Sequence, residues 1–407
     1  MKSLKIKLKL NYDQKLILNT MSNEHRLLYN HLLEFVKNNK NSDFKSINEQ
    51  YKNYRNDNKL TISSKSAQNT SRIFINNIKS FFKLRKKDKT SKFPYKFKSW
   101  KYFTAFTYDW NNGSGGFKFN NNQLEINLNS VKNKLIIELN KELLEKFQIN
   151  NDTIKTITFK KENDNYYLIC VYSEKPSNIN ILNKNNFISL DLGITNLYTL
   201  FSNKIENQSL INSRFDNLQK RIEFIQSILD KKKKYSINWK KLNKRFLRLK
   251  RKLSDKNKDF QHKVSTNLIE DCKNNNIGMI YCGDIKTKSI IKKENYKLKS
   301  TSKNFGLSRF KTFLEYKSKD AGIDFKKISE FNTSKINCLT NKIEFDSNLK
   351  NREVEINNNF KIDRDLNSAI NIAQKIKGKW LTQFLVQNNK FELNKMYMNY
   401  NSELVCI

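Results

Sequence analysis

Apolar and polar positions alternate with different periods along the chain, and these periods predict its elements. Residues 4–10 alternate strictly between apolar side chains and lysine, which is the period of a half-exposed strand. A helical pattern follows from Asp13, a candidate N-cap, to about Val36, and a second one runs from about Ser66 to Leu84. We therefore expect a strand followed by a small basic helical module.

Short strands are predicted after the helical module. The pattern from Lys96 to Glu174 is mostly that of β structure, with a turn at Asn111–Gly116 and a hairpin made by Ile154–Phe159 and Tyr166–Tyr172. Short strands separated by turn signals favour a small barrel or a curled sheet. We expect the N-terminal lysine strand to complete this sheet, which would make the helical module an insertion.

The second half of the chain has an α/β pattern. The apolar strand Phe187–Ile194 precedes a long antiparallel pair of helices, whose apolar positions recur between Leu218 and Leu253 and whose outer faces are basic. Two further strands, Ile277–Ile285 and Phe325–Ile328, flank another helix. The expected fold is α/β and multidomain, with an RNase H-like sheet that carries insertions.

Two acidic motifs about 170 residues apart are the main candidates for chemistry. Asp191 lies inside the strand F-I-S-L-D-L-G-I, where a carboxylate is costly unless a cation or a hydrogen bond compensates it. Asp363 and Asp365 lie in I-D-R-D-L-N-S-A-I-N-I, at the start of a predicted helix. Several carboxylates with few other ligands are typical of Mg²⁺ (or Mn²⁺) sites and of two-metal phosphodiester hydrolysis. We expect Asp191 and Asp365 to be catalytic ligands and Asp363 to be a capping or supporting residue.

A third carboxylate has two candidates. Asp284 ends a buried strand, at the position expected for the middle acidic residue, but the neighbouring position, where a glutamate would be an equal candidate, is Gly283. Glu330 ends the next strand, just before the turn at Thr333. We favour Glu330 as the third catalytic and metal-binding residue, with Asp284 as the alternative.

Composition indicates the kind of partner. Lysine and arginine number 78 against 39 acidic residues, so the formal net charge is +39, and a polyanion such as nucleic acid would relieve the repulsion. Aromatic and basic residues interleave in Phe81–Lys87 and Lys92–Lys101, where rings can stack on bases while lysines hold phosphates. No stretch approaches the roughly 18 apolar residues of a membrane span. We expect nucleic-acid partners, no membrane association, and a cytoplasmic, nucleoid-associated location.

Cysteine and histidine usage argues against other site chemistries. The five cysteines are scattered singly, so no disulfide framework is predicted. Cys338 stands alone in the segment Lys335–Phe360, whereas a zinc ribbon needs four thiolate or imidazole ligands. We therefore do not expect zinc, and we expect Cys338 to be inert. His262 is expected to be an ordinary helix-face histidine.

As a set, several motifs resemble the TnpB (OrfB) family of transposon-encoded, RNA-guided DNA nucleases, which are relatives of the miniature type V CRISPR effectors. L-D-L-G-I resembles the family's first RuvC motif, F-Q-H-K-V-S the helix before its second, and D-R-D-L-N-S-A-I-N-I its third. The other similar segments are H-R-L-L-Y-N (His25–Asn30), P-Y-K-F-K-S (Pro94–Ser99), Gly306–Ile323 and the following E-F-N-T-S-K.

The resemblance implies a wedge-like N-terminal β-barrel with a helical recognition insertion, and a RuvC-like nuclease with a target-nucleic-acid-binding insertion. By position, Asp191 and Asp365 would be catalytic, while the family's middle glutamate would fall at Gly283. Of the four zinc-ribbon cysteines only Cys338 is kept; the other three positions are Asn341, Glu355 and Asn358. The expected domains are 1–10 with 92–178 (barrel), 11–91 (helical insertion), 186–330 with 361–380 (nuclease), 331–360 (insertion lacking zinc) and 381–407 (C-terminal tail).

The implied activity is RNA-guided cleavage of DNA. The partners would be a guide RNA encoded at the transposon end and a double-stranded target DNA with a short adjacent motif, cut with Mg²⁺ or Mn²⁺. The missing middle glutamate and zinc ligands motivate an alternative, a nuclease-impaired protein that binds DNA through its guide RNA and acts by occupancy. A general RNA-binding protein is a third possibility.

Overall fold

The computed structural model divides the chain into two compact units, Met1–Pro176 and Ser177–Ile407, which we describe separately. Together they make an α/β multidomain protein. Pro94, most of the turn expected at Asn111–Gly116, and Asn358 lie outside the described residues. The described residues are 1–39, 43–93, 96–110, 116–129, 134–162, 164–173, 182–212, 215–284, 306–345, 352–357, 360–378, 381, 385–386, 391–398 and 404–406.

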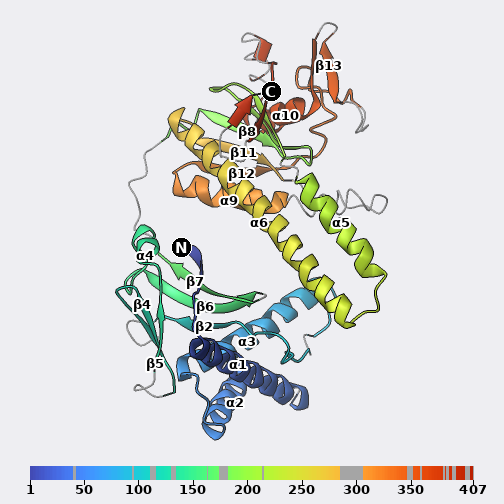
Figure 1. The fold of residues 1–407 in the computed structure, drawn as a ribbon. Coiled ribbons are helices and arrows are strands. Elements are labelled where there is room, and N and C mark those ends of the chain that lie inside the picture. Colours follow the sequence, from blue (N-terminus) through green and yellow to red (C-terminus); the bar gives the residue numbers. More distant parts are fainter. Residues whose placement is uncertain are drawn as a thin grey trace. The chain divides into compact units, whose positions relative to one another are not determined.

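The strands of the N-terminal unit form two antiparallel sheets (Figure 1). Their bounds are β1 (Lys2–Lys7), β2 (Phe106–Asp109), β3 (Phe117–Asn120), β4 (Gln123–Asn127), β5 (Lys134–Glu138), β6 (Ile154–Glu162) and β7 (Asn165–Tyr172). One sheet has the order β1-β7-β6-β2 and the other β3-β4-β5. The N-terminal strand therefore pairs with a strand from the end of the unit, as predicted, with Leu4 opposite Cys170. Since the strands are divided between two sheets, a closed barrel stays a prediction.

The described part of this unit also contains the helices α1 (Tyr12–Asn38), α2 (Phe44–Asp57), α3 (Ser64–Lys87) and the short α4 (Lys141–Lys146). The prediction that Asp13 is the N-cap of α1 is wrong. Asn11 caps α1 through a reciprocal pair of hydrogen bonds with Gln14, which satisfies two backbone N–H groups that would otherwise lack partners. Helix α2 was not predicted, because only Ile47 and Tyr51 are buried on its inner face.

The C-terminal unit is built on a seven-stranded mixed sheet with the order β12-β11-β8-β9-β10-β15-β16. Its strands are β8 (Phe187–Asp191), β9 (Asn196–Ser202), β10 (Gln208–Ile211), β11 (Met279–Gly283), β12 (Asp324–Ile328), β15 (Asn394–Met398) and β16 (Leu404–Cys406). Strands β8, β11 and β12 are parallel, so their carboxyl ends lie at the same edge of the sheet. Strands β15 and β16 come from the residues expected to form a C-terminal tail, and they extend this sheet instead.

Helices cover both faces of the seven-stranded sheet. Helices α6 (Ile237–Asn274) and α9 (Leu307–Asp320) share a hydrophobic cluster with one face, and α10 (Arg364–Lys377) shares another with the opposite face. The hairpin of β13 (Glu353–Asn357) and β14 (Phe360–Asp363) leads directly into α10. The two faces therefore have different helical neighbours, which decides what each strand residue meets.

The predicted long helical pair is confirmed as α5 (Asp216–Asp230) and α6, which pack through their own hydrophobic cluster (Figure 1). Helix α6 carries many lysines and arginines outside its apolar face, as predicted, whereas α5 has only Lys220 and Arg221 against three acidic residues, so the prediction of a basic outer face is wrong for α5. Among the described residues, no helix combines the length and the apolar character needed to cross a membrane.

Candidate active site

Strand β8 brings Asp191 to the face of the sheet that α10 covers. Alternate residues of a strand face opposite sides, and Ile188 packs in the cluster of α6 and α9, whereas Phe187 packs in the cluster of α10. Ser189 faces α10 as well, since its hydroxyl donates a hydrogen bond of 2.7 Å to the carbonyl of Ala369. Asp191 continues this series at the carboxyl end of the strand.

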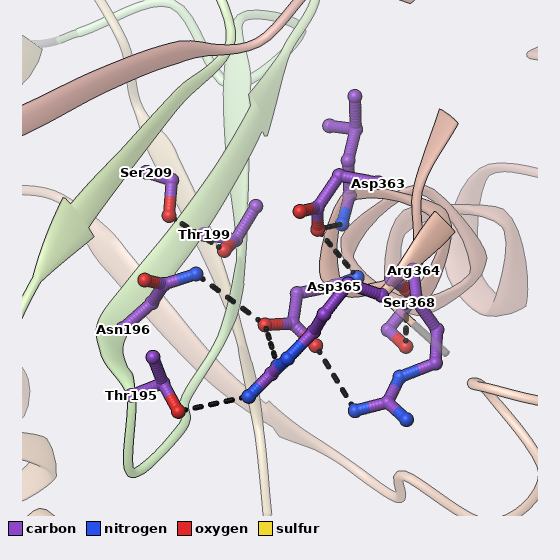
Figure 2. Close-up of polar contacts among 10 residues, drawn as sticks. Thr195, Asn196, Thr199, Ser209, Asp363, Arg364, Asp365 and Ser368 are labelled. Carbon is purple, nitrogen blue, oxygen red and sulfur yellow. Dashed lines mark hydrogen bonds and ion pairs between the residues drawn. The ribbon is translucent and has the colours of Figure 1, made fainter. Parts of the chain in front are cut away.

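The N-terminus of α10 brings a second carboxylate to the site. The Asp363 carboxylate accepts hydrogen bonds from the backbone N–H groups of Asp365 (2.8 Å) and Leu366 (3.3 Å), as Figure 2 shows. This confirms the prediction that Asp363 caps the helix, where a carboxylate also interacts favourably with the helix dipole. Asp365 is thereby fixed in the first helical turn.

Asp365 is surrounded by cationic and amide groups (Figure 2). Its Oδ2 accepts a hydrogen bond from Asn196 Nδ2 at 3.4 Å and lies 3.3 Å from Arg352 Nη1. Its Oδ1 lies 3.6 Å from Arg364 Nη2, while Arg352 also donates to Thr195 Oγ1 at 2.8 Å. Thr195 and Asn196 directly follow the L-D-L-G-I motif, so the two acidic motifs meet at this site.

Glu330 occupies the space above Gly283. In β11, Tyr281 packs in the cluster of α10, so the alternating Gly283 faces the same side as Asp191. A Cβ atom built on Gly283 would lie 1.9 Å from Glu330 Oε1 and 2.7 Å from its Cδ. The carboxylate of Glu330 thus stands where a side chain at position 283 would stand.

Asp284 is paired with a lysine of α9, although its charge also acts on Glu330 and helps to raise the pKa of that carboxyl. It directly follows the last residue of β11, and its Oδ1 lies 2.5 Å from Lys311 Nζ. Its backbone N–H donates to the carbonyl of Ile328 at 2.7 Å. In contrast, Glu330 Oε1 is buried and has no hydrogen-bond partner among the described residues.

The electrostatics bring Asp191, Glu330 and Asp365 into one group. Burial, followed by the charges of Glu330 and Asp365, holds the pKa of Asp191 well above its ordinary value, and the charge of Arg364 opposes this. Burial also raises the pKa of Glu330 to about 7, against the opposing charge of Lys311. The charges of Glu330 and Asp365 thus act on Asp191, and a cation bound at Asp191 would relieve this repulsion.

Two family models match the second half of the chain. The model described as "Probable transposase" matches residues 169–289, and the one described as "Cas12f1-like, TNB domain" matches residues 308–372. A TnpB-like protein of Acanthamoeba polyphaga mimivirus is 27% identical over 239 residues, which are 56% of this chain and 45% of the relative. A TnpB-like protein of Methanocaldococcus jannaschii is 24% identical over 273 residues, 64% of this chain and 92% of the relative. The chain is a TnpB-family relative of the miniature type V effectors.

The fold agrees with this relationship. The solved structure of the Cas12f1–sgRNA–target DNA complex aligns with a TM-score of 0.59 and 15% identity, covering 89% of this chain and 83% of that chain. At this identity the likeness concerns the fold, which is therefore an α/β multidomain fold of the TnpB and Cas12f type. The chain spans less than half the length, 45%, of the mimivirus relatives that it matches.

The acidic residues of this TnpB relative fit a hard divalent cation by their chemistry, though they are not gathered around one point. Among the described residues, no group of three or more acidic, histidine or cysteine side chains is arranged to hold a metal ion. Arg352 and Arg364 form ion pairs with Asp365, while Glu330 Oε1 is buried and has no hydrogen-bond partner among the described residues. Carboxylate oxygens in this state suit Mg²⁺ or Mn²⁺.

Hydrogen bonds hold the segment around Cys338. Cys338 is fully buried, and burial raises the pKa of its thiol to about 12. The Asn337 amide donates to Glu344 Oε2 at 2.6 Å and to the Ile356 carbonyl at 3.0 Å, and it accepts from the backbone of Leu339. An amide network thus connects the turn around Cys338 with strand β13.

Sequence reasoning missed several side chains at this site. Arg352, Lys311 and Lys375 lie outside recognisable acidic motifs, and single basic residues give no signal in a chain with 78 of them. The interpretation of His262 as a helix-face histidine is confirmed, because its ring stacks on Phe313 at 3.8 Å between centroids and burial lowers its pKa to about 4.

Proposed function

We propose that this chain is an RNA-guided DNA endonuclease of the TnpB type. It would bind a guide RNA encoded by the transposon end and cleave complementary double-stranded DNA beside a short motif. The observation that carries the proposal is the place of Glu330 in the space left open by Gly283, on the face of the sheet that Asp191 shares with α10. It supports Glu330 as the third carboxylate, in place of the side chain that position 283 lacks.

The topology supports an RNase H-like, RuvC-type nuclease. Strands β10, β9 and β8 form an antiparallel series, and β11 and β12 continue it in parallel with β8. Their carboxyl ends and the N-terminus of α10 supply the acidic residues, which are far apart in sequence. The likeness to a Cas12f1 structure that contains sgRNA and target DNA supports RNA and DNA as partners.

Asp191, Glu330 and Asp365 would hold Mg²⁺ or Mn²⁺. Bound metal would supply an activated water for attack on the phosphodiester and would stabilise the leaving oxygen. The charges of both other carboxylates act on Asp191, so Asp191 is the residue best placed to share a cation with each of them. Asp284 is held by Lys311, so its part is to support β11 and α9.

The segment 97–102 of the N-terminal unit carries three exposed aromatic residues, Phe97, Trp100 and Tyr102, and is a candidate RNA contact. These side chains are 49%, 75% and 76% exposed. Asn30 of α1 holds this segment, because its side-chain amide donates to the Lys98 carbonyl at 3.0 Å and accepts from the Lys98 N–H at 2.8 Å. Exposed rings held in place among lysines suit stacking on unpaired bases.

The test is to co-express the chain with its flanking genomic DNA, purify it and sequence the bound RNA. The complex is then incubated with a plasmid that carries the guide-matched target and randomised flanks, with Mg²⁺ or with EDTA. Cleavage with Mg²⁺ only, at targets with a common flanking motif, is the expected result. A discrete bound RNA with target binding but no cleavage would support the occupancy alternative instead.

A further inference from the structure

Helix α10 holds the segment that carries Glu330 at three points. Lys375 Nζ donates hydrogen bonds to the backbone carbonyls of Ser329 (2.8 Å) and Phe331 (2.7 Å), the two residues that flank Glu330. The Asn371 amide donates to the carbonyl of Thr333 at 2.8 Å. The carbonyls of Ser329, Phe331 and Thr333 are therefore all bound by side chains of the same helix.

Glu330 needs such a support because it lies outside the sheet. Strand β12 ends at Ile328, so no ladder hydrogen bonds fix the backbone of Glu330. A glutamate at position 283 would instead sit at the end of β11, where the backbone is paired with Ile328. Within the segment itself, the Thr333 N–H and hydroxyl donate to the Glu330 carbonyl at 3.2 and 3.0 Å, and the Phe331 N–H donates to Ser329 Oγ at 3.4 Å.

We propose that Lys375 is a positioning residue that holds Glu330 above Gly283. The proposal rests on Glu330 being the third carboxylate of the proposed nuclease. Lys375 acts through the backbone on either side of Glu330, and it belongs to the helix whose first turn carries Asp365. One rigid helix thus supplies one carboxylate and sets the position of another. Asn371, buried beneath the same segment, continues the support toward Thr333.

The ammonium group of Lys375 also lies close enough to Glu330 for its charge to lower the pKa of that carboxyl, against the effect of burial. A lysine that only adds charge to the solvent-exposed surface would not donate hydrogen bonds to the carbonyls on both sides of an acidic residue. Partners that orient a metal ligand typically affect metal affinity or activity by about 10- to 100-fold. We expect that range for loss of Lys375.

The variants are Lys375→Met, which keeps the aliphatic stem, Lys375→Arg, which keeps two donors, and the control Lys377→Met, which removes a charge from the same helical turn. Hydrogen–deuterium exchange of the peptide covering 328–335 and the midpoint of Mn²⁺ binding are measured on the RNA-bound protein. Lys375→Met should speed exchange and raise the Mn²⁺ midpoint and lower cleavage by about 10- to 100-fold. Lys375→Arg should restore most of both, and Lys377→Met should change neither. Unchanged exchange in Lys375→Met would overturn the proposal.

A second background separates this inference from the proposed function. In Gly283→Glu/Glu330→Ala the third carboxylate is returned to β11, and Lys375→Met should then cost less than about twofold in Mn²⁺ affinity, because coupled residues lose their interaction when one partner is replaced. A persisting tenfold loss would mean that Lys375 acts elsewhere. Unimpaired cleavage by Glu330→Ala alone would instead refute Glu330 as the third carboxylate.

Discussion

Replacing Gly283 with alanine is the smallest change that tests the position of Glu330. The added Cβ would lie 1.9 Å from Glu330 Oε1, and ordinary contact begins at 3.4 Å, so the carboxylate must move by about 1.5 Å. Misplacement of a reacting group by about 1 Å can cost 10²-fold in rate. We therefore expect Gly283→Ala to lower the single-turnover rate of guide-matched plasmid cleavage by about 100-fold or more.

The fold itself should tolerate this alanine. The backbone of Gly283 lies outside the left-handed region, and the clashing atoms belong to the far end of a side chain. The midpoint of thermal unfolding and the affinity for RNA should therefore change little. The matched control is Gly283→Ala in Glu330→Ala, where the three nearest clashing atoms are gone, so the midpoint of thermal unfolding should equal that of Glu330→Ala. A wild-type rate in Gly283→Ala would show that Glu330 does not work from above position 283.

Three further perturbations probe the rest of the account. Asp191→Ala should abolish cutting and leave RNA affinity nearly intact, as measured by filter binding; equal loss of both would sink the catalytic assignment. In EDTA, burial raises the pKa of Glu330 from 4.5 to about 7, so protonation of this carboxyl stabilises the folded state at pH values below 4.5. This contribution to the free energy of unfolding is lost as the pH rises through about 7. The free energy of unfolding should therefore fall across that pH range in the wild-type protein and fall less steeply in Glu330→Gln. Parallel pH curves for the two proteins would contradict this. Trp100→Ala with Tyr102→Ala should weaken RNA binding by about 1–3 kcal/mol per stacked base, unlike the exposed control Tyr12→Ala.

The sequence predicted those elements whose signal is local and strong. Alternation and apolar runs located β8 and β11, and the Asp363 cap followed from its place before a helix of small and apolar residues. The same reasoning missed α2, because two buried residues are too few to reveal a helical face. It placed the cap of α1 two residues late, because both Asn11 and Asp13 are suitable caps and only the hydrogen bonds to Gln14 decide between them.

The candidate site was predictable only in part, since its decisive features are contacts between distant segments. Asp284 and Glu330 both end strands, and only their contacts, with Lys311 of α9 and with Gly283, separate them. The space above Gly283 and the reach of Lys375 to the Glu330 segment depend on how β11, β12 and α10 pack. Strands β15 and β16 were missed because strands of five and three residues are too short to show a recognisable alternation.

The most direct test of the central claim compares Glu330→Ala with Asp284→Ala in one RNA-guided cleavage assay, at equal RNA occupancy and saturating Mg²⁺. Loss of a metal ligand should reduce cleavage by Glu330→Ala to background, whereas Asp284→Ala should retain cleavage to within about tenfold, the lower end expected for a supporting residue. The opposite ranking, with Glu330→Ala active and Asp284→Ala inactive, would contradict the account and assign the third carboxylate to β11.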